Sequence, residues 1–333
     1  MRGAQSIALA GFDPSAGRGA ALSARMRGRL AESLRYIIAA MDGKVPVPKR
    51  EMAAFLARLE GGPVSPLVFG AYCDLVLALD TNAHDEAERL AAELAGAPNA
   101  PPGLRVIELA DPDDDVQADR YRRLVDTDVD MPFAIHPPPA SDAANVRGLI
   151  DSAFALLDAG NLDLADEICA MLQEIVLAVG PDDPQAAQFD GVSSFMLWGA
   201  IVLNVRAFKT ALDMVQVLAH ESGHNLLFGL CAHGPLQDND ESERYSSPLR
   251  LDPRPMDGIV HATYVSARMH QAVQRLADAG VLDAAQQDEA RAANAENVQR
   301  FVMGMETIDR HARLTELGRT VLDGAVQYMA RYR

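Results

Sequence analysis

The sequence contains little cysteine, no long apolar run and few basic residues relative to acidic ones. Its three cysteines, Cys73, Cys169 and Cys231, lie far apart and form no Cys-x-x-Cys pair. This spacing argues against a disulfide framework or a thiolate metal site and fits a reducing cytoplasm. No run of about 18 apolar residues is present, so we expect no membrane-spanning helix. The first eleven residues lack the apolar region and cleavage site of a secretory signal, and we therefore expect a cytoplasmic protein.

The charge balance narrows the set of partners. The 333 residues include 30 Lys and Arg against 47 Asp and Glu, which gives a formal net charge of −17. Nucleic acids and anionic membrane surfaces are therefore not expected as partners, whereas a cationic substrate would be tolerated. The composition is 49% apolar, and the length allows one large domain or two ordinary ones. The sequence does not indicate an oligomeric state.

The apolar periodicity predicts an α+β protein that is predominantly helical. Helices are predicted over 20–41, 50–60, 70–80, 84–96, 143–157, 162–179 and 259–280, with two more within 283–333. Short strands are predicted over 105–109 and within 192–205, where residues are β-branched or apolar. We expect a mainly helical N-terminal region over 1–104 and a catalytic region over 105–333.

The segment His220-Glu221-Ser222-Gly223-His224 is the most informative motif. Two histidines four residues apart lie on one face of a helix, so both imidazoles can reach a single ion. Thr210 with Asp213 three residues later predicts a capping box at the start of this helix, and Gly234-Pro235 predicts its end. Apolar residues recur at helical spacing between them, so we expect the motif on a buried helix.

Two metal chemistries suit this motif, and the third ligand distinguishes them. In a zinc hydrolase both histidines bind zinc and Glu221 is the general base. In a non-haem iron enzyme two histidines and one further side chain hold Fe(II). Leu227 and Leu230 stand where the metzincin extension requires Gly and His, so that class is excluded. The remaining histidines are expected to be surface or structural residues, namely His84, His136, His270 and His311.

Several residues after the motif could supply the third ligand. Glu241 and Glu243 lie at the distance a gluzincin ligand would have, but in a polar stretch without helical periodicity. His261 follows Gly258 at the start of an apolar helical run and is the preferred candidate, although it could equally be a satisfied core residue. His233, just past the motif helix, is a weaker choice.

A proline-stiffened loop lies between the motif and His261. It contains Tyr245, Ser246, Ser247, Arg250 and Arg254, with prolines at 248, 253 and 255. Arginine can clamp a carboxylate with two parallel hydrogen bonds, and the hydroxyl groups add donors. A 2-oxo-acid oxygenase needs such an anchor for its cosubstrate. The alternative is that either arginine pairs with Asp252 or another neighbouring acid.

Three sequence elements, in this order along the chain, resemble the bacterial HExxH-motif peptide-modification family. They are His220 to His224, Tyr245 to Pro255 and Gly258 to Ala262. Members of that family are iron(II)- and 2-oxoglutarate-dependent enzymes that hydroxylate β-carbons of residues in ribosomal peptides. Their fold differs from the double-stranded β-helix of other oxygenases. The resemblance is strong over about residues 190–270 and does not cover the first hundred.

The resemblance together with ligand chemistry implies Fe(II) held by His220, His224 and His261, with 2-oxoglutarate and O₂ as cosubstrates. Arg254 or Arg250 would receive the far carboxylate of 2-oxoglutarate, and Glu221 would act in catalysis. The substrate would be a residue of a peptide, or a free or carrier-bound amino acid. A zinc-dependent HExxH peptidase or hydrolase is the alternative, and a non-catalytic peptide-binding relative is a third reading.

Overall fold

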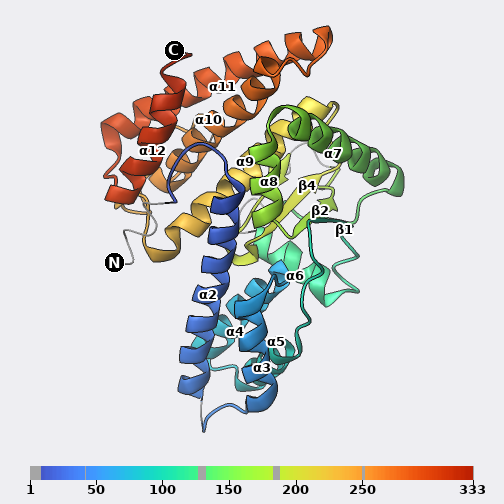
Figure 1. The fold of residues 1–333 in the computed structure, drawn as a ribbon. Coiled ribbons are helices and arrows are strands. Elements are labelled where there is room, and N and C mark those ends of the chain that lie inside the picture. The colour runs from blue at the N-terminus through green and yellow to red at the C-terminus, as the bar shows by residue number, and fades with distance from the viewer. Residues whose placement is uncertain (1–8, 42, 127–132, 183–187, 250–251, 333) are drawn as a thin grey trace. The chain divides into compact units, whose positions relative to one another are not determined.

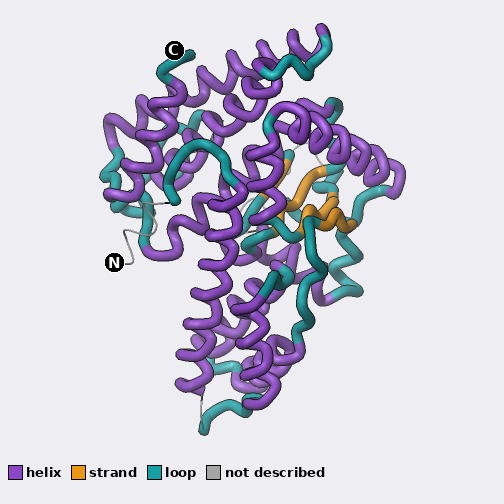
Figure 2. The backbone as a smooth tube through the Cα atoms, viewed as in Figure 1, coloured by secondary structure: helices purple, strands orange, loops and turns teal. Residues whose placement is uncertain are grey.

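The computed structural model describes residues 9–41, 43–126, 133–182, 188–249 and 252–332. Helices predominate and one small sheet is present, which confirms the α+β, mainly helical fold class (Figures 1 and 2). The chain folds as two compact units, each built from separate stretches of sequence. The first unit contains 1–19, 144–168 and 208–333, and the second contains 20–143 and 169–207. The expected functional boundary near residue 104 stays a prediction.

The second unit contains the sheet and most of the N-terminal helices. Its helices are α2 (Ala16–Met41, of which the first residues belong to the first unit), α3 (Lys49–Gly61), α4 (Pro66–Asp80), α5 (His84–Gly96) and α6 (Val116–Val125). Its strands are β1 (Arg105–Glu108), β2 (Glu174–Ala178), β3 (Gly191–Val192) and β4 (Ala200–Asn204), with the 3₁₀ turn η1 (Phe195–Leu197) before β4. The strand order is β1-β2-β4-β3, in which β3 alone runs antiparallel to its neighbour.

The central strands β2 and β4 are buried along their whole length. Apart from Glu174 at the start of β2 and Asn204 at the end of β4, both strands are apolar throughout, which is typical of parallel strands covered on both faces. The helix predicted over 162–179 is wrong in its second half, because α8 (Leu162–Met171) ends before β2 begins. A buried apolar run of this length carries no periodicity that separates a helix from a strand. The prediction also missed α6, whose first turn is capped by Asp115.

The first unit is an assembly of helices. It contains α9 (Ala211–Leu230), the 3₁₀ turn η2 (Cys231–His233), α10 (Met256–Asp278), α11 (Ala284–His311) and α12 (Glu316–Met329), with most of α7 (Ala140–Gly160) and of α8. Helix α10 packs against α9, α11 and α12 (Figure 1). A Cβ added at Gly304 of α11 would lie 2.0 Å from Thr263 Oγ1 of α10, so glycine is required for this close approach.

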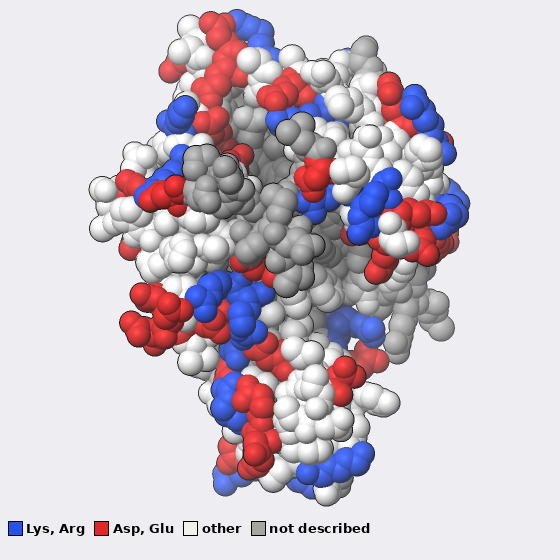
Figure 3. Space-filling view, turned by 180° about the vertical axis from the view of Figure 1, so that it is seen from behind, with Lys and Arg blue, Asp and Glu red and all other residues white. Residues whose placement is uncertain are grey.

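Acidic and basic side chains are interspersed over the face shown in Figure 3, where neither sign forms a single continuous field. Among the described residues, no helix combines the length and apolar character that a bilayer crossing requires.

Candidate metal centre

The HExxH segment lies in the middle of α9, as predicted, and the helix begins where the sequence indicates. Thr210 Oγ1 accepts from the Asp213 backbone N–H at 3.0 Å, and the Asp213 carboxylate accepts from the Thr210 N–H at 3.2 Å. This reciprocal pair satisfies two donors that the first turn of a helix otherwise leaves open. Glu221 is 3% exposed, and the His220 side chain is 22% exposed.

Helix α10 brings His261 to the HExxH histidines. His261 is 6% exposed and lies in the second turn of α10. Its Nδ1 atom is 3.1 Å from Nδ1 of His224, and the two rings stack with an interplanar angle of 20°. His224 Nε2 is in turn 3.1 Å from His220 Nε2. The three imidazoles that the sequence suggests as ligands therefore form one continuous group in the first unit.

Gly223, within the HExxH segment, allows the two helices to approach. A Cβ built on this residue would lie 3.0 Å from Cγ1 of Val265, which stands one turn after His261 on α10. A larger side chain at position 223 would therefore press on α10 beside the histidines. The small residue between the two histidines of the motif thus has a packing role that fits the position of His261.

The orientation of the His224 ring is not that of a completed metal site. His224 presents Nε2 to His220 and Nδ1 to His261, whereas an ion is bound by one nitrogen of each ring. Among the residues that the structure describes, no group of three or more His, Cys, Asp or Glu side chains is arranged to hold a metal. Two nitrogens bound to one ion at about 2.1 Å lie roughly 3.0–3.4 Å apart, so the pairwise spacing is suitable. Rotation of the His224 ring would be needed for all three rings to share one ion.

Electrostatics favours the neutral imidazoles that metal binding requires. Burial, together with the smaller effects of the Arg300 and His261 charges, lowers the pKa of His220 to about 4. Burial, with smaller contributions from His220 and His261, also brings the pKa of His224 well below its ordinary value. Burial lowers the pKa of His261 too, partly offset by Asp257. All three rings are therefore neutral near neutral pH, and each has a lone pair to donate.

Two carboxylates lie next to this group. Glu221 Oε1 is 3.8 Å from His220 Nε2, and Asp257 Oδ2 is 3.8 Å from His261 Nε2. Asp257 faces the ring nitrogen that points away from His224, where a carboxylate would orient His261 and leave Nδ1 to face the other histidines. The sequence interpretation did not single out Asp257. Its spacing of four residues from His261 on a predicted helix was the signal that could have identified it.

The loop that was expected to anchor 2-oxoglutarate is only partly described. Tyr245 and Arg254 pair through their backbones, with N–H to O distances of 2.8 and 2.9 Å. Arg254 Nη2 lies 2.7 Å from Asp252 Oδ2, so the alternative pairing that the sequence left open is the one observed. Arg250 lies outside the described residues. Tyr245 donates its hydroxyl to Glu243 Oε2 at 2.5 Å.

Three of the expected loop residues line a cavity of about 490 Å³ in the first unit. The loop contributes Arg244, Tyr245, Ser246, Ser247 and Pro248, and α11 contributes Met303, Glu306, Thr307, Arg310 and His311. Arg310 Nη2 lies 3.6 Å from Oε2 of Glu306, which is on the same helix. Arginines and hydroxyl donors therefore outnumber the acids, although the chain as a whole is strongly acidic.

The residues of α11 were missed by the sequence interpretation. Arg310 and Thr307 follow the loop by more than fifty residues, and only tertiary packing brings them together. The same helix carries Arg300, whose charge acts on His220. Helix α11 therefore carries both a charge that acts on the histidine group and part of the lining of the cavity.

Among the side chains that the structure describes, the other histidines and the alternative acidic ligands do not join the three-histidine group. Glu241 is exposed, and Glu243 binds Tyr245 and Asn239. His84 and His136 are exposed, and the ring of His311 packs beside Tyr245. His270 is buried and contacts the Tyr328 hydroxyl at 2.9 Å. The side chain of His233 lies outside the described part of the structure.

No protein-family model matches the chain, and no curated protein is significantly similar to it.

Proposed function

We propose that the chain is a mononuclear Fe(II) enzyme that uses 2-oxoglutarate and O₂ to hydroxylate a carbon of an amino-acid residue, with His220, His224 and His261 as iron ligands. The observation that carries this proposal is the contact of three neutral imidazoles from α9 and α10, with ring nitrogens 3.1 Å apart in both pairs. Three nitrogen donors on one side of an ion leave open positions for a cosubstrate and O₂. When bound, Fe(II) with these cosubstrates would supply the oxidant for an unactivated C–H bond.

The residues of the chain would bind and orient the reactants. Asp257 Oδ2 lies 3.8 Å from His261 Nε2, and the Phe228 ring of α9 packs 5.4 Å from the ring of His261, which is 6% exposed and so largely shielded from water. The protein would thereby limit side reactions and fix the substrate near the ion. Glu221, buried next to His220, would orient that histidine or contact the substrate.

The dicarboxylate cosubstrate would be bound by the loop after α9. Tyr245, Ser246 and Ser247 line a donor-rich cavity, which supports an anion in this part of the unit. Arg254 or Arg250 would receive the far carboxylate. For Arg254 to bind the cosubstrate, it would have to release the carboxylate of Asp252. The far carboxylate of 2-oxoglutarate would then replace it as a chemically equivalent partner.

A zinc hydrolase is the second candidate, and the position of Glu221 favours it. Its carboxylate is buried 3.8 Å from Nε2 of His220. A base in that position could take a proton from a metal-activated water, as in other HExxH hydrolases. In that reaction the loop cavity would bind part of a peptide substrate and no 2-oxoglutarate would be consumed.

Metal and turnover measurements on the full chain separate the two candidates. The protein is purified without oxygen, freed of metal and reconstituted with Fe(II) or Zn(II). Succinate is then measured by mass spectrometry with and without O₂, and peptide cleavage is measured in parallel. We expect about one iron per chain and succinate formed only when Fe(II), 2-oxoglutarate and O₂ are all present. Peptide cleavage by the zinc form without succinate would establish the hydrolase instead.

Matched histidine variants test the ligand set. His224→Ala and His261→Ala should each weaken metal binding by more than about tenfold. His84→Ala, which removes an exposed histidine at the start of α5, should leave it unchanged. If His261→Ala retains iron as tightly as the parent chain, the third ligand is wrong. Arg254→Ala should raise the 2-oxoglutarate requirement far more than it lowers the metal content, and equal loss of both would make this arginine structural.

A further inference from the structure

A buried ionic group in the first unit contains more cations than anions, and the proposed reaction makes no use of it. The group consists of Arg18 from the N-terminal stretch, Glu167 from α8 and Arg268 from α10. The exposed fractions of these residues are 7%, 0% and 1%. Both guanidiniums form ion pairs with the same carboxylate, so the three side chains together carry a charge of 2 − 1 = +1.

The contacts of the two guanidiniums hold them in place but leave this excess charge. Arg18 Nε donates to Glu167 Oε2 at 2.7 Å, and Arg268 Nη2 donates to Glu167 Oε1 at 2.5 Å. Each guanidinium also donates to a backbone carbonyl, Arg18 to that of Gly11 and Arg268 to that of Phe12. A carbonyl oxygen accepts a hydrogen bond without carrying a full negative charge. The group therefore keeps its net positive charge.

Two buried donors in this region have no acceptor. The Nε atom of Arg268 and the hydroxyl of Tyr264 make no hydrogen bond within the described residues. Tyr264 is 0% exposed, so bulk water does not reach its hydroxyl. Buried polar atoms in folded proteins are nearly always hydrogen-bonded, and an exception is often explained by a bound water or ion. These two donors therefore indicate a small ligand.

Tyr264 and Arg268 are neighbours on the surface of α10. They stand four residues apart, and helical side chains lean toward the N-terminus, so Arg268 covers the turn that holds Tyr264. The Phe12 ring packs against the Tyr264 ring with centroids 5.7 Å apart. Burial raises the pKa of Tyr264, while the charges of Arg268 and Arg18 lower it and that of Glu167 raises it. The phenol therefore lies close to all three charges of the group.

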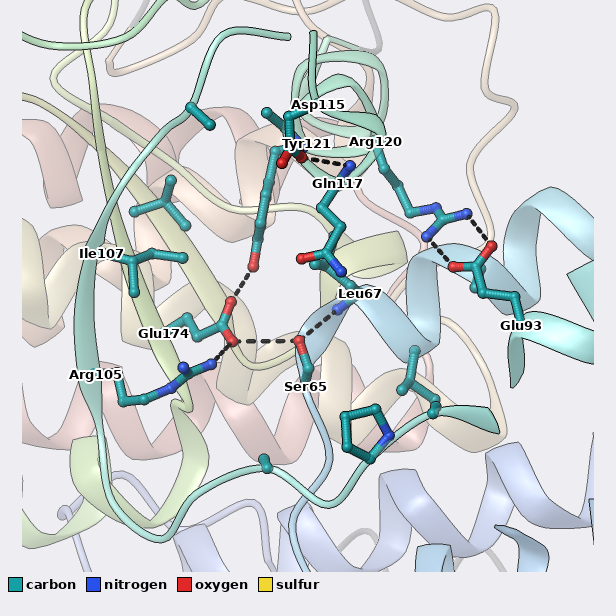
Figure 4. Close-up of a pocket in the computed structure, with 18 of the residues that line it drawn as sticks. Ser65, Leu67, Glu93, Arg105, Ile107, Asp115, Gln117, Arg120, Tyr121 and Glu174 are labelled. Atoms are coloured by element: carbon teal, nitrogen blue, oxygen red, sulfur yellow. Dashed lines mark hydrogen bonds and ion pairs between the residues drawn. The ribbon is translucent and has the colours of Figure 1, made fainter. Parts of the chain in front are cut away.

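The second unit contains a similar group in which the charges cancel and the phenol has an acceptor. At the wall of a cavity of about 530 Å³, the carboxylate of Glu174 accepts from the Tyr121 hydroxyl, from Arg105 and, at 3.2 Å, from Ser65 Oγ (Figure 4). One guanidinium meets one carboxylate there, which gives 1 − 1 = 0. The group at Tyr264 differs in both respects, in its net charge and in its unbonded hydroxyl.

We propose that Arg268 Nε and the Tyr264 hydroxyl bind one small monovalent anion of the halide class, such as chloride, beside the Glu167 ion pairs. An anion would accept from both donors and would also cancel the excess positive charge. A water molecule would accept the two hydrogen bonds but would leave the charge uncompensated, which is unfavourable in a buried site. The ligand is small because protein atoms enclose both donors.

The anion would stabilise the packing next to the candidate metal centre. Arg268 joins the N-terminal stretch to α10 through the Phe12 carbonyl, at 3.1 Å. Its Cγ atom lies 3.9 Å from the position of a Cβ built on Gly223, which belongs to the HExxH segment of α9. The anion would therefore support the contact between α9 and α10, the helix that carries His261. This role requires no metal.

Urea unfolding of the full chain without added metal tests the proposal. Midpoints are measured in sodium chloride, sodium bromide and sodium gluconate at one ionic strength, so that screening is constant and only the halides are small enough for the site. Both halides should raise the midpoint relative to gluconate. Above the dissociation constant, the unfolding equilibrium constant should fall about tenfold for each tenfold rise in chloride, because the unfolded chain does not bind the anion. Equal midpoints in the three salts would overturn the proposal.

Two variants and a matched control locate the anion. Tyr264→Phe removes one donor and should weaken chloride binding roughly tenfold or more, because a hydrogen bond to a charged ligand is lost. Arg268→Gln removes the excess charge together with Nε, so its midpoint should no longer depend on chloride. Tyr121→Phe, which removes the phenol bonded to Glu174, should lower the midpoint equally in chloride and gluconate. If Tyr264→Phe also lowers it equally in all salts, the hydroxyl binds water and the anion proposal is wrong.

Discussion

Replacing Glu167 by glutamine tests how the N-terminal segment is attached to the helices that carry the candidate metal centre. Glu167 on α8 is fully buried. Its Oε2 accepts from Arg18 Nε at 2.7 Å and from the Ser15 N–H at 2.9 Å, and its Oε1 accepts from Arg268 Nη2 at 2.5 Å. Arg268 belongs to α10 and also donates to the Phe12 carbonyl at 3.1 Å. One carboxylate therefore compensates two buried guanidiniums.

The expected cost is large because glutamine keeps the shape of the side chain but removes the compensating charge. Arg268 is 1% exposed and Arg18 is 7% exposed, so neither can recover its hydration. Removing one partner of a buried ion pair costs about 3–5 kcal/mol. That is a large part of the roughly 5–15 kcal/mol that stabilises a typical domain. Urea unfolding followed by circular dichroism should show a lower midpoint with an unchanged slope.

Two companion variants make the result decisive. Asp166→Asn removes the neighbouring exposed charge on the same helix, and it should change the unfolding free energy by less than about 0.5 kcal/mol. Combining Glu167→Gln with Arg268→Met removes one stranded cation and should recover part of the loss. A loss below about 1 kcal/mol in Glu167→Gln alone would refute this reasoning, because the two guanidiniums would then be compensated in another way.

Three further variants test packing and pH dependence, each by urea unfolding. Gly318→Ala places a Cβ 1.9 Å from the Leu236 carbonyl oxygen, so the backbone has to move. The free energy of unfolding should fall by about 2 kcal/mol or more. A change below about 0.5 kcal/mol would contradict the close approach. Gly70→Ala presses on the Arg120 side chain and should cost about 1–3 kcal/mol, and an unchanged midpoint would show that this side chain can move aside. Burial lowers the pKa of His270 from 6.5 to about 4, so below pH 6.5 the unfolded chain takes up a proton that the folded chain does not. The stability contribution of His270 should therefore fall by about 2 kcal/mol between about pH 7.5 and about pH 5. The His270→Gln protein should lose correspondingly less unfolding free energy over that range. An identical loss in both proteins would disprove the assignment.

The sequence by itself determined most of the helical elements and the first half of the candidate metal centre. The expected helix around the HExxH motif begins at the Thr210–Asp213 capping box because capping and side-chain spacing are local properties. The two histidines of the motif share a face of α9 for the same reason. The helix over 84–96 and the strand at 105–108 also followed from local pattern.

Only the tertiary structure decided which distant groups meet. His261 lies beside His224 because α10 packs on α9 at Gly223, and no local pattern encodes that contact. Strand β2 could not be separated from the preceding helix by sequence, because burial on both faces removes the alternation that identifies a strand. The contact of Arg254 with Asp252 likewise depended on the folded loop. Local chemistry fixes where helices start and which face is apolar, whereas contacts between residues far apart in sequence arise from packing, which depends on the shapes of all neighbouring side chains at once.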